Sequence, residues 1–463
     1  MAEFSLQHSR EDRAFVILCL FLLLVVFTGG GSRADIQSLA ILRPVAIAMT
    51  AFGLLTLGRK HLQDYKALLV GAAVIFIVAA LYLVPLPPAI WGILPSHAVV
   101  LEVDRLAGLG SVWRPLALAP DEAWNSVMSL FVPLGVLLVG VQIGPQRHVH
   151  LAWFAAALIM LSAIVAGLQL VSPGTSALYP YRITNDGMAV GLFANRNHQA
   201  TMLSCLLLLL MALVSTGSKV FRHYQIRAII AFVVGGLFVI PLILVTGSRA
   251  GVLTMVVALA LCPLLYVGPA MLARGRTAVL RISRSWAFAA MAGAVVFAIV
   301  ATLMLGSSTP GIAHFQSRLS GDLRVSLWTS AIDMMGTYMP FGSGPGSFVD
   351  VYNIYERQSQ LSPQYANHVH NDWLEIVLTT GIFGILALVV AVVAWVRRAL
   401  AVLQGGRTNT GLLHRLGLGL VLIIAIASFV DYPIRVPMVA SLLALAAIWA
   451  CMARSPDQNR SVQ

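Results

Sequence analysis

Residues 367–384 read NHVHNDWLEIVLTTGIFG, and this stretch decides how the chain can fold. Its first part is polar and holds two histidines, two asparagines and an aspartate. After Glu375 the chain is uncharged and largely apolar as far as residue 396. An apolar run of about 20 residues is long enough to cross a bilayer as a helix. The stretch therefore predicts a membrane-spanning helix over 373–396 with reactive side chains at its beginning.

The composition of the whole chain extends this interpretation. The chain has 463 residues, of which 59% are hydrophobic and only 10% are charged. A soluble domain of this size cannot bury so much apolar surface. The sequence thus predicts an all-α polytopic membrane protein. We expect about twelve transmembrane helices, over residues 14–30, 38–57, 67–85, 124–142, 151–171, 199–216, 228–246, 250–269, 286–305, 373–396, 412–430 and 436–452.

The distribution of basic residues predicts the orientation of the chain. If the N-terminus is cytoplasmic, nineteen of the thirty Lys and Arg residues, including every Lys, fall in cytoplasmic segments. The positive-inside rule favours this orientation and puts both termini in the cytoplasm. The first span follows Arg10 and Arg13 and has the pattern of a signal peptide, but eleven further spans favour an uncleaved helix.

Charge and cysteine content say which partners to expect. The net charge of +12 indicates loops that face anionic membrane lipids and gives little reason to expect nucleic acid. The four cysteines, Cys19, Cys205, Cys262 and Cys451, all lie within apolar runs. We therefore expect them to form neither a disulfide nor a zinc site.

Four regions follow from this pattern. Residues 1–190 hold the N-terminal spans, 191–400 hold the polar motifs described below, 401–454 hold the last spans, and 455–463 form a polar cytoplasmic tail.

Three of the predicted outer loops, over 86–123, 172–198 and 306–372, are long enough to be functional or disordered. The loop over 86–123 is rich in proline and tryptophan. The loop over 306–372 is the longest, and its periodicity predicts a folded cap with an amphipathic helix near 323–336.

His368 and His370 precede the predicted helix over 373–396. They are two residues apart, so in an extended chain they point to the same side. The N-terminus of a helix carries partial positive charge, which keeps a nearby imidazole neutral. A neutral imidazole can accept a proton from a hydroxyl, which is the work of a general base. A zinc site with Asp372 or His314 as a third ligand is a weaker alternative.

The first turn of the same helix carries a capping signal. Asp372 and Glu375 form a D-x-x-E pattern, which predicts a capping box. Asn371 is an alternative cap.

Arg249 lies in VTGSRAGVL, residues 245–253, between two long apolar runs. A charge at the membrane boundary is costly unless it is paired or functional. We predict that Arg249 binds an anion, although its side chain could also simply extend to the headgroups.

Another polar cluster precedes the span over 199–216. Asn195, Arg196, Asn197 and His198 stand together in FANRNHQ, residues 193–199. Amides and a guanidinium can bind sugar hydroxyls and phosphate, whereas either asparagine could instead cap the helix.

The longest loop adds two features. Arg318 and Arg324 precede Trp328 in SRLSGDLRVSLW, a mixture that a helix lying at the membrane interface also shows. PFGSGPGSF, residues 340–348, predicts a turn, with a backbone anion site as the alternative. Walker and Rossmann motifs do not occur in the sequence.

Together these segments resemble the O-antigen ligase and polymerase superfamily, integral membrane glycosyltransferases of bacterial cell envelopes. The resemblance covers roughly residues 190–400. The matching pieces, in order, are NRNH (195–198), GSRAG (247–251), RVSLW (324–328) with MPFGSGPGSF (339–348), and HVHNDWLEIVLTTGIFG (368–384).

The resemblance implies a GT-C-like helical fold in the bacterial inner membrane, with a periplasmic active site beneath a loop cap. It implies a glycan donor on undecaprenyl pyrophosphate and a metal-independent reaction without a cofactor. It assigns Arg249 and Arg324 to the donor pyrophosphate, and it makes His370 either the base or the residue that positions the acceptor. Further candidates for substrate contacts are Arg196, Asn195, Asn197, His368, Arg318 and Asn371.

Three functions remain open on the sequence. A ligase would transfer the glycan to lipid A–core, and a polymerase would transfer it to another lipid-linked repeat. Either reaction would invert the anomeric carbon if it is a single displacement. A secondary transporter with twelve spans is less favoured, because the polar clusters lie at the outer boundary and the chain shows no internal repeat.

Overall fold

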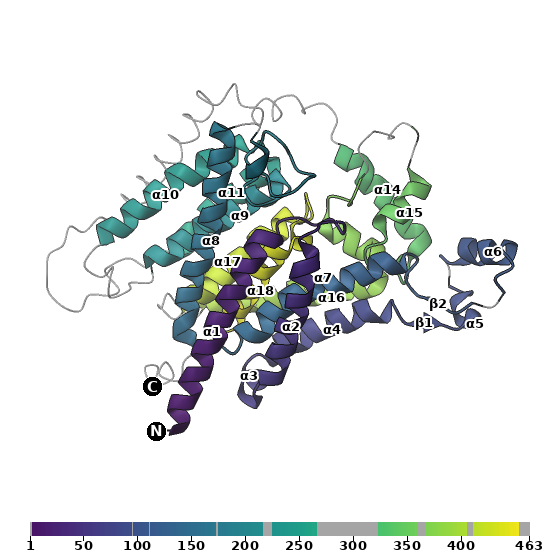
Figure 1. Ribbon diagram of the computed structural model, residues 1–463, viewed down its shortest axis with the longest axis horizontal. Coiled ribbons are helices and arrows are strands. Elements are labelled where there is room, and N and C mark those ends of the chain that lie inside the picture. Colours follow the sequence, from purple (N-terminus) through teal and green to yellow (C-terminus); the bar gives the residue numbers. More distant parts are fainter. Residues whose placement is uncertain are drawn as a thin grey trace.

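The computed structural model describes residues 2–94, 96–110, 112–172, 175–215, 225–265, 323–356, 358, 366–404 and 411–452. This part of the chain is mostly helical, as predicted (Figure 1). Its longer helices are α1 (Ala2–Thr28), α2 (Leu39–Thr56), α4 (Lys66–Leu81), α7 (Pro120–Gly140), α8 (Pro145–Val171), α9 (Arg196–Ser215), α10 (Gln225–Val245), α11 (Arg249–Leu265), α14 (Leu323–Tyr338), α16 (Asp372–Gln404), α17 (Leu412–Ala427) and α18 (Pro437–Cys451).

Short elements connect these helices. They are α3 (Arg59–Asp64), α5 (Pro88–Trp91), α6 (Ala98–Leu106), α15 (Phe348–Tyr355), the 3-10 turns η1 (Ser176–Leu178) and η5 (Pro433–Arg435), and the strands β1 (Pro85–Leu86) and β2 (Arg114–Pro115).

Eleven of the twelve predicted spans coincide with described helices, and the span over 286–305 lies outside the described residues. In this part of the chain, α2, α7, α8, α9 and α16 are long and apolar enough to cross a membrane. Shorter apolar helices accompany them, among them α4, α11, α17 and α18. The chain is therefore a helical membrane protein. Helices α7 and α8 begin earlier than predicted, at Pro120 and Pro145, because proline favours the first helical position.

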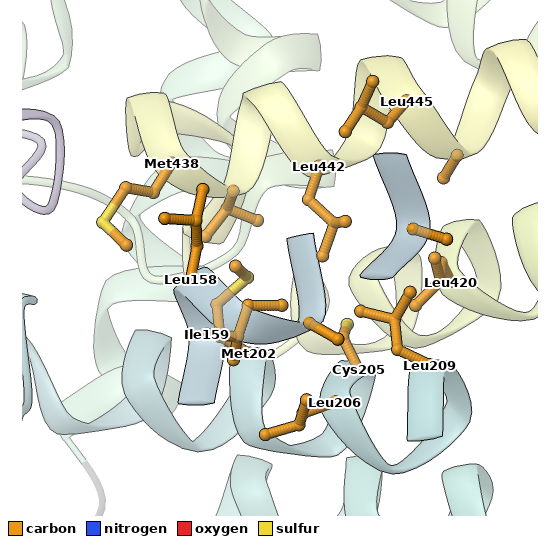
Figure 2. Packing of buried hydrophobic residues seen from close by; sticks show 14 of the residues in the cluster. Leu158, Ile159, Met202, Cys205, Leu206, Leu209, Leu420, Met438, Leu442 and Leu445 are labelled. Atoms are coloured by element: carbon orange, nitrogen blue, oxygen red, sulfur yellow. The ribbon is translucent and has the colours of Figure 1, made fainter. Parts of the chain in front are cut away.

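Helix α9 lies at the centre of the helix bundle. Seventeen of its twenty residues are buried, and it packs against α8, α10, α11 and α17. Its sequence is apolar on every side from Cys205 to Leu213, as expected for a helix surrounded by other helices. Figure 2 shows Met202, Cys205, Leu206 and Leu209 of α9 within the same apolar cluster as Leu158 of α8 and Leu442 of α18.

The beginnings of α9 and α11 are held close together. A Cβ added to Gly251 would lie 2.4 Å from the Cβ of Ala200, so only glycine permits this approach. One turn further on, the Ser204 and Thr254 hydroxyls are 3.0 Å apart. The polar cluster before α9 and the arginine that begins α11 are thereby positioned at the same end of the bundle.

Helix α16 is broken in its N-terminal part. Gly381 has a φ of 55°, and the loop that follows α14 packs into the break. The Ile382 N–H donates to the Pro340 carbonyl at 2.8 Å, and the Gly344 N–H donates to the Thr379 carbonyl at 2.8 Å. The Tyr82 hydroxyl donates to the Thr380 carbonyl at 3.0 Å. The glycine-rich segment over 340–348 is thus a packing turn, as predicted, with backbone donors used inside the protein.

Replacing Gly381 by alanine is expected to lower the free energy of unfolding by about 2 kcal/mol, because alanine resists a positive φ. The added Cβ would also lie 2.1 Å from the Pro340 carbonyl oxygen. Thermal unfolding in detergent measures the change. Gly71→Ala in α4 is the matched control, since nothing lies within 4 Å of its Cβ position. Equal melting temperatures for the two variants would contradict the role given to the break.

Helix α14 forms part of the predicted cap. Its buried residues Leu327, Ala331, Met334 and Tyr338 recur at helical spacing and pack with α15 and α16. The helix predicted near 323–336 is therefore confirmed, with one buried face, and it ends at Tyr338.

The outer loop predicted over 86–123 is largely structured. It contains α5, α6 and β2, and β2 pairs antiparallel with β1. In Figure 1 these elements form a small lobe at one end of the bundle. Arg114 of β2 forms an ion pair with the buried Asp104 of α6, and the Trp91 indole donates to the Pro115 carbonyl at 2.9 Å.

Candidate active site

The His370 imidazole lies within hydrogen-bonding distance of the Asp431 carboxylate. The two residues are 61 positions apart, and the His370 Nδ1 lies 3.0 Å from the Asp431 Oδ1. Asp431 stands in the short turn between α17 and η5, and its side chain is only 2% exposed. The His370 side chain is 25% exposed, so the imidazole remains open to a reactant on one side.

The protein holds the Asp431 carboxylate in its ionised form. The Asn197 side-chain amide donates to Oδ2 at 2.6 Å, and the Tyr432 backbone N–H donates to Oδ1 at 3.1 Å. Burial opposes the charge, but the hydrogen bond from His370 and the nearby charge of Arg324 lower the pKa of Asp431 below its ordinary value.

An ionised Asp431 determines which nitrogen of His370 carries the proton. A carboxylate can only accept hydrogen bonds, so the neutral imidazole must donate from Nδ1. Its Nε2 then keeps the lone pair and can accept a proton from a hydroxyl. The arrangement is that of a base oriented by a carboxylate, which is the pattern expected of general-base catalysis.

His370 also has an unusual backbone conformation. Its φ is 55°, and it is the one non-glycine residue with positive φ among the described residues. Such a conformation costs roughly 1–2 kcal/mol for a residue with a side chain. It persists where the surrounding structure imposes it, and such residues cluster at functional sites.

The helix that follows is capped by Asn371. Its Oδ1 accepts the Leu374 N–H at 3.1 Å. The capping box predicted for Asp372 and Glu375 is wrong, because both carboxylates are buried and have other partners. Asp372 binds Arg435 through the guanidinium Nε at 3.2 Å, and Glu375 binds the Arg435 Nη2 at 3.2 Å.

His368 forms a second pair with Glu375. Its Nδ1 lies 3.0 Å from Glu375 Oε1, and the Val369 N–H donates to the other carboxylate oxygen at 2.9 Å. Burial lowers the pKa of His368, although Glu375 opposes the shift. Because Arg435 already compensates Glu375, this pair is less suited than His370–Asp431 to receive a proton.

The polar cluster at the beginning of α9 meets the same site. Asn197 binds Asp431, as described above, and the Asn195 amide donates to the Tyr432 hydroxyl at 3.5 Å. His198 is 1% exposed, and neither ring nitrogen has a hydrogen-bond partner among the described residues. These amides, like that of Asn371, contact protein groups, and their contact with substrate remains a prediction.

The predicted arginines lie on three different elements, and of these Arg324 is shown to act on the His370–Asp431 pair. The Arg196 Nη1 donates to the Thr246 carbonyl at 3.2 Å, which joins its segment to the turn before Arg249. Arg249 is the first residue of α11 and is exposed. Arg324 lies in the first turn of α14, close enough for its charge to act on Asp431. Arg318 lies outside the described residues.

The zinc alternative gains no support from the described residues. His368 and His370 bind different carboxylates, and no three His, Cys, Asp or Glu side chains of this part of the chain are grouped as metal ligands. His314 lies outside the described residues.

Three residues of the site were not predicted from the sequence, namely Asp431, Tyr432 and Arg435. They follow one another in SFVDYPIRV, residues 428–436, between two apolar runs. The signal available in the sequence was the presence of an acidic residue, Asp431, and a basic residue, Arg435, in one short turn between two apolar runs.

Comparison with known proteins agrees with this picture. None of the curated proteins compared with the chain matches it. Residues 236–389 match the family model described as O-antigen ligase. The matched segment contains Arg249, Arg324, His368 and His370, whereas Asn197 and Asp431 lie on either side of it. By this segment, the chain is similar to the O-antigen ligase family.

Proposed function

We propose that this protein transfers a glycan from undecaprenyl pyrophosphate to an acceptor hydroxyl on the periplasmic face of the bacterial inner membrane. The observation that carries the proposal is the His370–Asp431 pair, which lies close enough to Arg324 of the O-antigen ligase-like segment for that charge to act on Asp431. The proposal includes twelve membrane spans, a GT-C-like fold and cytoplasmic termini.

The reaction uses the site as follows. The acceptor oxygen attacks the anomeric carbon of the donor sugar, and its proton passes to the His370 Nε2. The bond between that carbon and the phosphate oxygen breaks, and the electron pair leaves with undecaprenyl pyrophosphate. Asp431 stabilises the imidazolium that forms. This single displacement inverts the anomeric carbon.

Arg249 and Arg324 stabilise the leaving group. Guanidinium binds phosphate through two parallel donors and remains charged near lipid. Charge develops on the pyrophosphate as the bond breaks, and donors aimed at such charge each contribute roughly 3 kcal/mol to the barrier reduction.

We favour lipid A–core as the acceptor, which would make the protein a ligase. A polymerase that joins lipid-linked repeats is the alternative. Purified protein in liposomes, supplied with an undecaprenyl-pyrophosphate glycan and either acceptor, distinguishes the two by product mass. If neither acceptor received the glycan, the proposed function would be contradicted. A product of retained anomeric configuration would contradict single displacement.

Chelation is expected to leave the transfer rate unchanged, because the proposed chemistry uses side chains of the protein and no metal ion. The measurement compares initial rates in the same liposomes before and after dialysis against EDTA. A loss that zinc restores would instead favour a metal site that includes His368 and His370.

A further inference from the structure

The ring of Tyr432 lies among the three histidines of the site. Its centroid is 4.9 Å from that of His370, 4.3 Å from that of His368 and 5.0 Å from that of His198. The His370 and His198 rings meet it edge to face, at interplanar angles of 62° and 78°. This one side chain therefore contacts imidazoles from two segments that are about 170 residues apart in sequence.

Tyr432 is itself held at both ends. Its backbone N–H donates to the Asp431 carboxylate, which is the partner of His370. Its hydroxyl accepts the side-chain amides of Asn367 at 3.3 Å and of Asn195 at 3.5 Å. The residue is 5% exposed, and burial raises the pKa of its hydroxyl, which therefore stays protonated. These contacts and the burial of the side chain hold the Tyr432 ring in one position.

A fixed ring beside His370 can restrict a rotation of the imidazole that the hydrogen bond to Asp431 does not prevent. The torsion that rotates an imidazole about its Cβ–Cγ bond has a broad energy profile. A single hydrogen bond at Nδ1 limits this rotation only in part. The lone pair on Nε2 can therefore swing away from the acceptor oxygen unless a second contact holds the ring.

We infer that Tyr432 is a positioning residue, whose ring holds the His370 imidazole with Nδ1 toward Asp431 and Nε2 toward the acceptor hydroxyl. The inference rests on the proposed function, because it assumes that His370 accepts the proton. The ring supplies the effect. The hydroxyl only anchors the ring to Asn195 and Asn367.

Two substitutions separate the ring from the hydroxyl. Tyr432→Phe keeps the ring and is expected to keep kcat within about threefold of wild type. Tyr432→Leu keeps an apolar side chain without a flat face and is expected to lower kcat roughly 10²-fold, the scale of a 1 Å misplacement, with KM almost unchanged. Rates are measured in liposomes, on variants whose gel-filtration profile and melting temperature match the wild type. Should Tyr432→Leu not fold, Tyr432→Met fills the space with a flexible chain and serves the same test.

A double-mutant cycle shows whether Tyr432 acts through His370. In a His370→Ala background, Tyr432→Leu is expected to cause no further loss, because the ring then has no base to orient. An undiminished additional loss would overturn the inference, as would equal losses in the Phe and Leu variants. If His370→Ala alone retained full activity, the role of His370 as the base would fail instead, whereas a wild-type protein that transfers glycan to neither acceptor would contradict the proposed function, so these failures are distinguishable.

Discussion

Asp431→Asn is expected to lower kcat for glycan transfer by about 10²–10⁴-fold, the contribution of an effective general base. The amide can offer an N–H to the His370 Nδ1, which reverses the tautomer and places a proton on Nε2 where a lone pair is required. It also removes the charge that stabilises the imidazolium. Substrate binding should change little, because Asp431 is buried and contacts protein groups.

The measurement is the initial rate in liposomes at saturating acceptor. Asp64→Asn is the matched control, since Asp64 is exposed at the end of α3. The double variant with His370→Ala should be no slower than His370→Ala alone, because the two groups act as one unit. Independent, multiplicative losses would contradict the pairing.

The lowered pKa of Asp431 also predicts the pH dependence. A carboxylate whose pKa is lowered stays charged above its ordinary value of about 3.9, and its contribution is lost only as the pH falls further. Between pH 5 and pH 8 the Asp431 charge is therefore constant. Asp431 itself therefore contributes no change in rate across this range.

Arg249→Ala and Arg324→Ala are each expected to lower kcat by about 10²–10³-fold, the cost of removing one donor to a developing charge. Lysine should not restore the rate at either position if the phosphate contact is bidentate, because ammonium lacks the planar pair of donors. Arg105→Ala is the control, since Arg105 is exposed in the lobe and pairs with Glu102.

Arg324 has a second possible contribution, because its charge lowers the pKa of Asp431. The lysine variant separates the two. A lysine that only needs to keep Asp431 ionised would restore the rate, whereas one that must bind pyrophosphate would not. Recovery by Arg324→Lys together with failure of Arg249→Lys would leave Arg249 alone on the leaving group.

Much of the fold could be predicted because apolar runs of membrane length are visible without tertiary information. The helix at 323–336 followed equally from periodicity. The break at Gly381 could not be predicted, because it depends on Pro340, which packs against Gly381 from a loop that is distant in the sequence. Local sequence gave only a glycine within an apolar run.

The candidate site divides in the same way. His370 was identified from its place before a helix, and Arg249 from the cost of a charge at the membrane boundary. Asp431 was not identified, because its role depends on a contact with His370, which lies 61 residues earlier in the sequence. The D-x-x-E pattern misled for the opposite reason. It is a valid local cap, but burial beside Arg435 gave both carboxylates stronger partners than backbone N–H groups.

The break in α16 also fixes the depth of the chemistry. The segment from Ile382 to Gln404 contains 23 residues (404 − 382 + 1) and, at 1.5 Å per residue, is about 34 Å long. Its uncharged part, residues 382–396 ahead of Arg397 and Arg398, is only about 22 Å long and does not cross the roughly 30 Å hydrocarbon layer alone. In the topology that we propose, the nine residues of α16 before Gly381 complete the span, and His370 lies at the height at which a diphosphate anchored by a polyprenyl tail meets water.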